Sequence, residues 1–470
     1  MPWQPIPSVT EPHYLDTNLN QVQKCVNWYH EKTPNGFVLK SLHGFSVRNT
    51  VANNSACRGA KFDATSGYLF SVHDNTVYRS DGFGSSALTG TLSTNAGQVV
   101  LASGLSQLVV TDGLYGYVID PVAATVTKIT DGNFPANAQS CACINGQFLV
   151  TTSDNDRWYM SKVDDGLTWT PLISGRAITS GDKLAHVEVV RDIAYFIGFF
   201  STEPWSTSTV DPYLQPISGA AVPVGVRFPS HVARVGDRIC LFGWSDKAAP
   251  SLYAIEGGQL NKIATPYIES RIQSWDYNAK LIAYSIDGCD FLEAYQIMSA
   301  GFTGFIYNFA SGTWDEIPTS RGLAYVANAF ITGSAPIGFS GSDGSLYYMG
   351  LFNTQNGSNL VRILDFKIDG GMSRTVNQGI RFELEAQHDS SSSYTLSATL
   401  QKSDDAGRTF DTGITISKAI TNGTSAQQVI LQTPPLGSFK AGRIYRLTFT
   451  GPAARLILRR AEGLVTVGRF

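Results

Sequence analysis

The stretch "VVLASGLSQLVVTDGLYGYVIDPVAATVTKIT", residues 99–130, contains four short apolar runs separated by Gly, Asp and Ser. Short runs rich in Val, Ile and Tyr and bounded by such residues are typical of β-strands joined by tight turns. Residues 99–130 therefore predict a group of four antiparallel strands. A single group of this size cannot bury both of its faces, so it needs similar groups beside it.

The same pattern recurs along the chain, with starts roughly 40–50 residues apart, which is the period of four-stranded propeller blades. The groups begin at Arg58, Val99, Cys141, Ala185, His231, Trp275 and Tyr325. We therefore expect an all-β protein with a β-propeller at residues 46–355. Seven blades are favoured. Six is the alternative, in which the first or the last group contributes strands to a neighbour.

The two ends of the chain differ from this repeat. Residues 1–45 contain several prolines and little periodicity, which predicts an extended N-terminal arm. Residues 356–470 contain long alternating segments such as "SYTLSATLQKS". Alternation with one polar face predicts a C-terminal antiparallel domain that is β-sandwich-like.

The composition narrows the classes of function. Charged residues make up 16% of the chain and the formal net charge is −3. This charge gives no electrostatic reason to expect a protein that reads nucleic acid. We expect no secretion signal, and no apolar run approaches the ~18 residues that a membrane span requires.

The sequence does not predict a metal or a cofactor. The six cysteines are scattered rather than spaced as a disulfide framework. Cys141 and Cys143 would share one face of a strand, where we expect buried or surface thiols, with a metal site as the alternative. The Asp-rich turns "DDG" and "SDG" are expected to be ordinary hairpin turns, with weak Ca²⁺ binding as the alternative.

Residues 401–410, "QKSDDAGRTF", have the spacing of an Asp-box hairpin. Its members are Ser403, Asp405, Gly407, Thr409 and Phe410. In such a hairpin the Asp accepts turn amides, the Gly supplies a positive φ, and the aromatic residue packs into the core. A looser copy surrounds Asp164, with Lys162 in the serine position. The pattern predicts a structural turn rather than an active site.

A sialidase-like glycosidase is the enzyme that an Asp-box propeller suggests. Such an enzyme needs arginines around the substrate carboxylate, a nucleophile pair and an acid. The arginines of the propeller region are scattered, and no serine-hydrolase or zinc-protease motif is present. We therefore expect no catalytic residues and no enzyme. The first alternative is a propeller that binds a receptor or a glycan, and the glycosidase follows it.

The C-terminal strands are strongly basic. From Phe439 onward the basic residues are Lys440, Arg443, Arg446, Arg455, Arg459, Arg460 and Arg469, and Glu462 is the one acidic residue. Arginine pairs bidentately with carboxylates. We therefore predict an assembly interface with an acidic surface at Arg443, Arg446, Arg455, Arg459 and Arg460. The alternative is a solvated basic face. Strand alternation predicts that Arg455 and Arg459 share a face and that Arg460 points to the other.

The order of several local motifs resembles that of one family. The motifs are "VNWYHE" (26–31), "LKSLHGF" (39–45), "CRGAKF" (57–62), "GYLFSVHDNTVYR" (67–79), Asp154 with Trp158, Asp182, Arg191-Asp192, and Ser201, Glu203 and Trp205 in "IGFFSTEPW". Followed by the Asp-box hairpin and the basic closing strands, this order is similar to that of the packaged-DNA stabilisation proteins. These are the tail hub or nozzle proteins of short-tailed bacteriophages (podoviruses). The chain departs from the family at His43-Gly44, where the family has Pro-Gly, and at Ala406, which separates Asp405 from Gly407.

The resemblance implies a structural virion protein without enzymatic activity. It implies a homo-oligomeric ring, expected to be a hexamer, that connects the portal-adaptor to the distal tail, retains the packaged DNA and forms the exit channel for DNA ejection. The implied partners are the portal-adaptor, tail fibre, spike or needle proteins, and double-stranded DNA that passes non-specifically. The implied location is the virion tail, after assembly in the bacterial host cytoplasm. A near-neutral charge suits a tube through which a duplex must slide.

Overall fold

The computed structural model describes residues 3–6, 9–10, 24–81, 84–177, 181–209, 213–276, 278–298, 301–317, 323–327, 336–350, 352, 354–355, 358–387, 392–421, 425–451 and 455–467. In this part of the chain nearly every regular element is a β-strand. The exceptions are the short helix α1 (Pro266–Ile272), which Thr265 caps, and the 3₁₀ turn η2 (Pro229–His231). No described helix is both long and apolar enough to cross a membrane.

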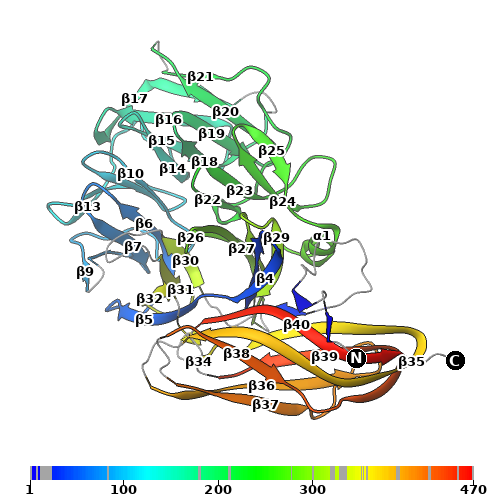
Figure 1. The fold of residues 1–470 in the computed structure, drawn as a ribbon. Helices are drawn as coiled ribbons and strands as arrows, with labels where there is room; N and C mark the ends of the chain where they lie inside the picture. Colours follow the sequence, from blue (N-terminus) through cyan, green and yellow to red (C-terminus); the bar gives the residue numbers. More distant parts are fainter. Residues whose placement is uncertain are drawn as a thin grey trace.

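Six separate four-stranded antiparallel sheets are the blades of a β-propeller in the described part of the chain (Figure 1). The first three blades are β6 (Cys57–Asp63), β7 (Tyr68–His73), β8 (Thr76–Ser80) and β9 (Ser85–Ala87); β10 (Val100–Ser103), β11 (Leu108–Thr111), β12 (Gly116–Asp120) and β13 (Thr125–Lys128); and β14 (Ala138–Ile144), β15 (Gln147–Thr152), β16 (Arg157–Lys162) and β17 (Asp165–Arg176). The next two are β18 (Leu184–Val190), β19 (Ile193–Gly198), β20 (Thr202–Thr207) and β21 (Leu214–Pro216); and β22 (Val232–Val235), β23 (Arg238–Gly243), β24 (Ser251–Glu256) and β25 (Gln259–Lys262). The last consists of β30 (Leu323–Ala327), β31 (Ile337–Ser340), β32 (Ser345–Gly350) and β5 (Gly44–Thr50).

The blades hold together through the apolar faces between them. Phe70 and Tyr117 are buried between the first and second blades, and Trp158 and Phe196 between the third and fourth. Each blade thus buries both of its faces, as the sequence repeat requires. The all-β class and the propeller predicted from the repeat are confirmed.

The last blade is built from two distant parts of the chain. β5, near the N-terminus, pairs antiparallel with β32, from Gly44 opposite Gly350 to Thr50 opposite Ser345. Gly44 is required at this point because a Cβ atom there would lie 2.4 Å from the carbonyl oxygen of Phe352. An N-terminal strand therefore completes the blade made by residues 323–350.

The favoured count of seven blades is not supported. The group expected to start at Trp275 forms β26 (Ala279–Ile286), β27 (Cys289–Met298), β28 (Gly301–Asn308) and β29 (Thr313–Ile317). These strands do not form a separate sheet, because β2 (Cys25–Val26) pairs in parallel with β29 and antiparallel with β35 (Arg362–Gln387). They belong instead to a 14-stranded sheet that continues into the C-terminal strands.

A separate C-terminal sandwich is likewise not confirmed. Besides β35, the strands after residue 355 are β36 (Tyr394–Ser403), β37 (Ile414–Ile420), β38 (Gln427–Gln432), β39 (Gly437–Phe449) and β40 (Arg455–Val467), and the short pair β33 (Thr354–Gln355) and β34 (Ser358–Asn359) precedes them. The first part of β35 pairs with β39, and its second part pairs with β38 and β40. Because β35 takes part in both sets of hydrogen bonds, these strands remain one sheet, which folds around a shared core below the propeller in Figure 1.

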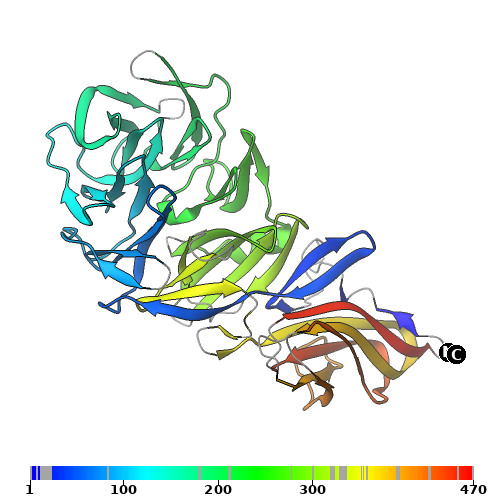
Figure 2. The same ribbon diagram turned by 60° about the vertical axis from the view of Figure 1, so that its left-hand side comes forward.

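The N-terminal strands belong to this same sheet. They are β1 (Gln4–Pro5), β2, β3 (Trp28–Thr33) and β4 (Gly36–Ser41). β1 and β4 pair with β40, and β2 lies between β29 and β35. Figure 2 shows these strands beside the C-terminal strands, away from the blades. The domain limits 1–45, 46–355 and 356–470 stay a prediction.

Candidate functional site

The predicted Asp-box residues lie in the turn that follows β36. The Asp405 Oδ1 atom accepts hydrogen bonds from the Ser403 hydroxyl at 2.7 Å and from the Thr409 backbone N–H at 2.9 Å. Its Oδ2 atom accepts the Thr409 hydroxyl at 2.6 Å, and the Gly407 N–H donates to the Ser403 hydroxyl. These hydrogen bonds hold the pKa of Asp405 below its usual range, first through the Thr409 hydroxyl. An exposed carboxylate surrounded by donors of its own turn is arranged for turn stability.

The inserted Ala406 changes the backbone of this turn. Ala406 has φ = 62° and Gly407 has φ = 84°, so two consecutive residues are left-handed. Phe410 also differs from the expectation, because it is only half-buried rather than part of the apolar core. Its ring covers the guanidinium of Arg446 instead, at 4.0 Å from ring centre to Cζ.

The Asp-box turn and the two arginines of β39 form one cluster, which the sequence did not indicate. Arg446 donates two hydrogen bonds of 2.8 Å to Asp365 on the neighbouring strand β35. Arg443 donates at 2.6 and 2.8 Å to Asp404, inside the turn, and also to the Leu436 carbonyl. Both arginines therefore have carboxylate partners in their own chain.

The arginines of β40 are also paired within the chain, but at the surface. Arg459 donates to Glu385 at 2.5 Å and Arg460 to Glu383 at 2.6 Å. The prediction that Arg460 points to the opposite face from Arg459 is wrong. A β-bulge lies between the pairs Leu384↔Leu458 and Glu383↔Arg460, so both arginines reach carboxylates two residues apart on β35.

Arg455 differs from the other four arginines of the predicted interface. It lies opposite Gln387 at the start of β40, and no described residue forms an ion pair with it. The structure thus brings Arg443 and Arg446 to the turn, places Arg459 and Arg460 in a surface row, and leaves Arg455 apart from both groups.

The looser Asp-box copy makes a different turn in the third blade. Asp164 has φ = 52°, and it is Asp165 whose Oδ1 accepts the Leu167 N–H at 3.0 Å. The Trp169 indole N–H donates to the Gly166 carbonyl at 2.8 Å and its side chain is buried. This turn also supports a hairpin.

Residues of the family-like motifs act as structural links between blades. Arg58 of "CRGAKF" is buried and makes five hydrogen bonds of 2.6–2.9 Å to Asp74, Thr94, Ala96 and Gly97, the last three on the segment between β9 and β10. A guanidinium has five N–H donors, so five such hydrogen bonds engage all of them. Arg58 therefore ties the first blade to the segment that leads into the second.

The motif "IGFFSTEPW" has a similar role. The Asp182 carboxylate accepts hydrogen bonds from the backbone N–H groups of Phe200 and Ser201 and from the Ser201 hydroxyl. Trp205 lies 5.6 Å from Trp158 between ring centres and packs edge-on against it, between the third and fourth blades. These residues order a turn and an interface between blades.

A cavity of about 600 Å³ lies between the first strands of several blades. Its charged lining residues are Arg58, Lys61, Glu188, Arg234 and Lys280, with His186 beside Glu188. Burial alone would raise the pKa of Glu188, but the hydrogen bond from His186 and the nearby positive charges lower it to about 2. Glu188 is the one carboxylate among these lining residues. A glycosidase requires two carboxyl groups across the scissile bond, so this lining does not form such a site.

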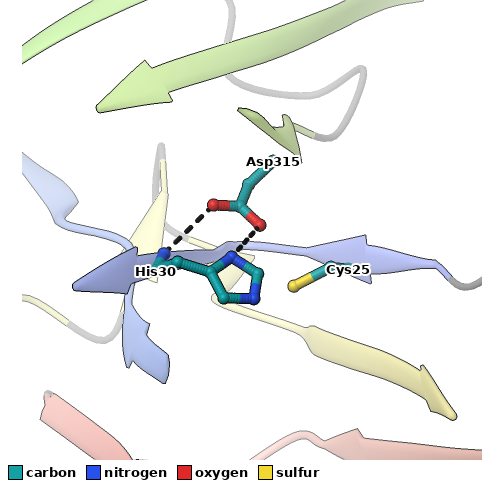
Figure 3. A group of neighbouring side chains, drawn as sticks. All are labelled: Cys25, His30 and Asp315. Carbon is teal, nitrogen blue, oxygen red and sulfur yellow. Dashed lines mark hydrogen bonds and ion pairs between the residues drawn. The ribbon is translucent and has the colours of Figure 1, made fainter. Parts of the chain in front are cut away.

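Sequence reasoning missed a cluster at the start of the 14-stranded sheet. Cys25, His30 and Asp315 come together there, although some 285 residues separate His30 from Asp315 (Figure 3). Cys141 and Cys143, the pair considered from sequence, lie instead at the apolar interface between the second and third blades. No spacing rule connects Cys25 with Asp315. The parallel pairing of β2 with β29 brings them together.

The blades and their linking residues belong to a region with a known relative. The family model described as "Bacteriophage P22 Gp10, beta-propeller" matches residues 25–291, which is more than half of the chain. The chain belongs to this phage-stabilisation family. The resemblance inferred from the motif order is thereby confirmed. The matched range includes Arg58, Asp182 and Trp205, whereas the Asp-box turn and the closing arginines lie beyond it.

The other comparisons are less specific than this family match. A search of curated proteins found no significant match. Among solved structures, the extracellular domain of the one-component system BT4673 from B. thetaiotaomicron matches with a TM-score of 0.44 and 11% identity over 71% of this chain. The match spans only 43% of the length of that extracellular domain. The computationally designed Ika8 protein matches with a TM-score of 0.36 and 9% identity, over 65% of this chain and 99% of its own.

Proposed function

We propose that this protein is the tail hub, or nozzle, subunit of a short-tailed phage. Copies of the chain, expected to number six, assemble into a ring below the portal and its adaptor. The ring retains the packaged DNA and forms the channel through which it leaves. The observation that carries this proposal is the family match over residues 25–291, since that family consists of phage proteins with this propeller.

The side-chain chemistry supports a structural rather than an enzymatic role. Several motif residues that carry the resemblance are engaged in contacts that hold the blades in place, as the five hydrogen bonds of Arg58 illustrate. Ring subunits need rigid surfaces that keep their shape on association. The proposed partners are other copies, the portal-adaptor, and fibre, spike or needle proteins, with the virion tail as the location.

The net charge of the chain supports a channel through which DNA passes without tight binding. The formal net charge is −3, and four of the five arginines singled out in the closing strands are paired with carboxylates of the same chain. Arginines that already have such partners are less available to neutralise phosphates, and it is this neutralisation that drives non-specific DNA affinity.

Native mass measurement together with electron microscopy of the purified protein tests this proposal. We expect closed rings, either from the protein alone or after addition of the portal-adaptor complex. A protein that stays monomeric with the adaptor and binds glycans on an array would instead be a receptor-binding propeller. Turnover of a fluorogenic sialoside, abolished by a point variant, would show a glycosidase.

A further inference from the structure

Three side chains with metal-binding atoms meet where the N-terminal strands join the 14-stranded sheet. Cys25 comes from β2, His30 from β3 and Asp315 from β29 (Figure 3). Their ligand atoms all lie within 4.8 Å of one another. All three residues are fully buried, so this cluster of polar groups is enclosed by protein.

The three groups already interact directly. Asp315 Oδ2 accepts the backbone N–H of His30 at 3.1 Å, and Asp315 Oδ1 lies 2.8 Å from Nδ1 of the His30 ring. Burial, followed by the charge of Asp315, raises the pKa of the Cys25 thiol.

We propose that Cys25, His30 and Asp315 bind a Zn²⁺ ion. Thiolate, imidazole and carboxylate are the three ligand types that zinc takes in proteins, whereas Ca²⁺ and Mg²⁺ prefer oxygen ligands throughout. Zinc bonds of about 2.0–2.3 Å place two tetrahedral ligands roughly 3.3–3.8 Å apart. The ligand atoms, which lie within 4.8 Å of one another, would have to move closer together to reach this spacing, and one further ligand would complete the tetrahedron.

The position of the site would let the ion cross-link strands that lie far apart in the sequence. β2 pairs in parallel with β29, where Val26 is opposite Glu316, and antiparallel with β35, where Cys25 is opposite Leu364. A metal held by β2, β3 and β29 would fasten the N-terminal strands to β29, nearly 300 residues further along the chain. Closing a chain loop of this length is entropically costly, so a cross-link there stabilises the folded state. This inference does not depend on the tail-hub proposal.

Metal analysis of the full chain provides the test. Because the ligands are buried, zinc must enter during folding, so the protein is produced in zinc-supplemented medium and is also refolded with zinc or with a chelator. We expect about one zinc ion per chain and a higher melting temperature for the zinc-refolded sample, as expected for a ligand that binds only the folded state. Refolding with Co²⁺ should give a thiolate-to-cobalt charge-transfer band in the near ultraviolet.

Matched variants distinguish this site from adventitious binding. Cys25→Ser and Asp315→Asn should lose the zinc and the cobalt band. The control is Cys240→Ser, which removes another fully buried thiol of the same core and should keep both. If a Cys25 variant does not fold, the wild-type chain still decides the question. Wild-type protein without zinc after both loadings, or with a melting temperature unaffected by zinc, would overturn the proposal and leave a hydrogen-bonded triad.

Discussion

Arg446 is held between Phe410, at 4.0 Å from the ring centre, and Asp365, to which it donates two hydrogen bonds of 2.8 Å. Asp365 is almost fully buried on β35, and Phe410 belongs to the Asp-box turn. One arginine of β39 therefore connects the turn after β36 to the long strand β35. This cluster lies outside the part of the chain that matches the phage family, so its properties have to be argued from its own contacts.

Removing the Arg446 side chain should be strongly destabilising. Arg446→Ala leaves the Asp365 carboxylate buried without its bidentate partner, and breaking such a pair costs about 2–4 kcal/mol. Arg446→Lys keeps a charge but loses the fork and the ring contact, so it should lie between Ala and wild type. Urea unfolding of the three proteins measures these differences.

Arg460 provides the matched control for this experiment. It is also paired with a carboxylate, Glu383, but its side chain is 60% exposed. Surface ion pairs contribute little to stability. Arg460→Ala should therefore unfold at the same urea concentration as wild type, and an equal loss in both variants would contradict the special role of Arg446.

The Asp405 carboxylate should matter for the turn and not for any chemistry. Asp405→Ala removes the acceptor for Ser403 and Thr409, so we expect a melting temperature lower by a few degrees, with assembly unchanged at room temperature. Ala406→Gly relieves a left-handed alanine and should be tolerated, whereas Ala406→Val should lower the melting temperature. An Asp405→Ala protein of wild-type stability that no longer supports infection would instead indicate a contact or chemical role.

Low pH should reduce the stability that the Asp-box turn and its arginine partners give to the fold. The hydrogen bond from Arg443 holds the pKa of Asp404 below its usual range, and Asp405 is lowered by its turn donors. Carboxylates with a depressed folded pKa stabilise the protein above the unfolded value of about 3.9 and lose this effect as the pH falls through the folded value. The urea midpoint should thus be flat from neutral pH to about pH 5 and fall below about pH 4.

A double variant checks the origin of this pH dependence. Asp404→Asn combined with Asp405→Asn removes both titrating groups and should flatten the acid limb relative to wild type. A stability that falls equally steeply in the variant would assign the effect to other carboxylates, of which Glu188 in the propeller cavity, with its pKa of about 2, is the first candidate.

The sequence predicted the blades well because each is a local repeat of strands and turns. The period near residues 99–130 needs no knowledge of distant parts of the chain. The predicted blade count was wrong at β26–β29. The two-residue strand β2 lies some 290 residues away in the sequence, and it joins these strands to β35. For the same reason a separate sandwich could not be distinguished from one folded sheet.

The sequence indicated the basic residues of the closing strands, but not the carboxylates with which they pair. Composition showed a surplus of arginine near the C-terminus, yet the carboxylates that pair with it, such as Asp365 and Glu385, come from a different strand. The predicted face of Arg460 was wrong because a bulge at Arg459 interrupts the alternation of side chains along β40. Cys25, His30 and Asp315 carry no local signal at all.

Arg455 is the clearest remaining test of an assembly interface at the closing strands. It has no ion-pair partner among the described residues, so Arg455→Glu should leave the fold intact by circular dichroism and reduce ring formation or adaptor docking at physiological salt. Arg459→Glu is a poor test, since it would also repel Glu385. Normal assembly of the Arg455→Glu protein would remove this residue from the interface.

Duplex DNA should bind the purified protein only weakly. We expect a dissociation constant no tighter than about 10⁻⁴ M at physiological salt, the weak end of non-specific affinity. Fluorescence anisotropy with a labelled duplex at two salt concentrations measures this. Sub-micromolar, salt-sensitive binding would contradict a channel through which DNA slides.

Retention of the genome in particles tests the central claim most directly. Particles of the parent phage that are assembled without this protein should package DNA and then lose it, and the purified protein, added before the loss, should restore retention. DNA protected from nuclease in sedimented particles is the quantity to measure. Particles that lack the protein but hold their full DNA content would contradict the account.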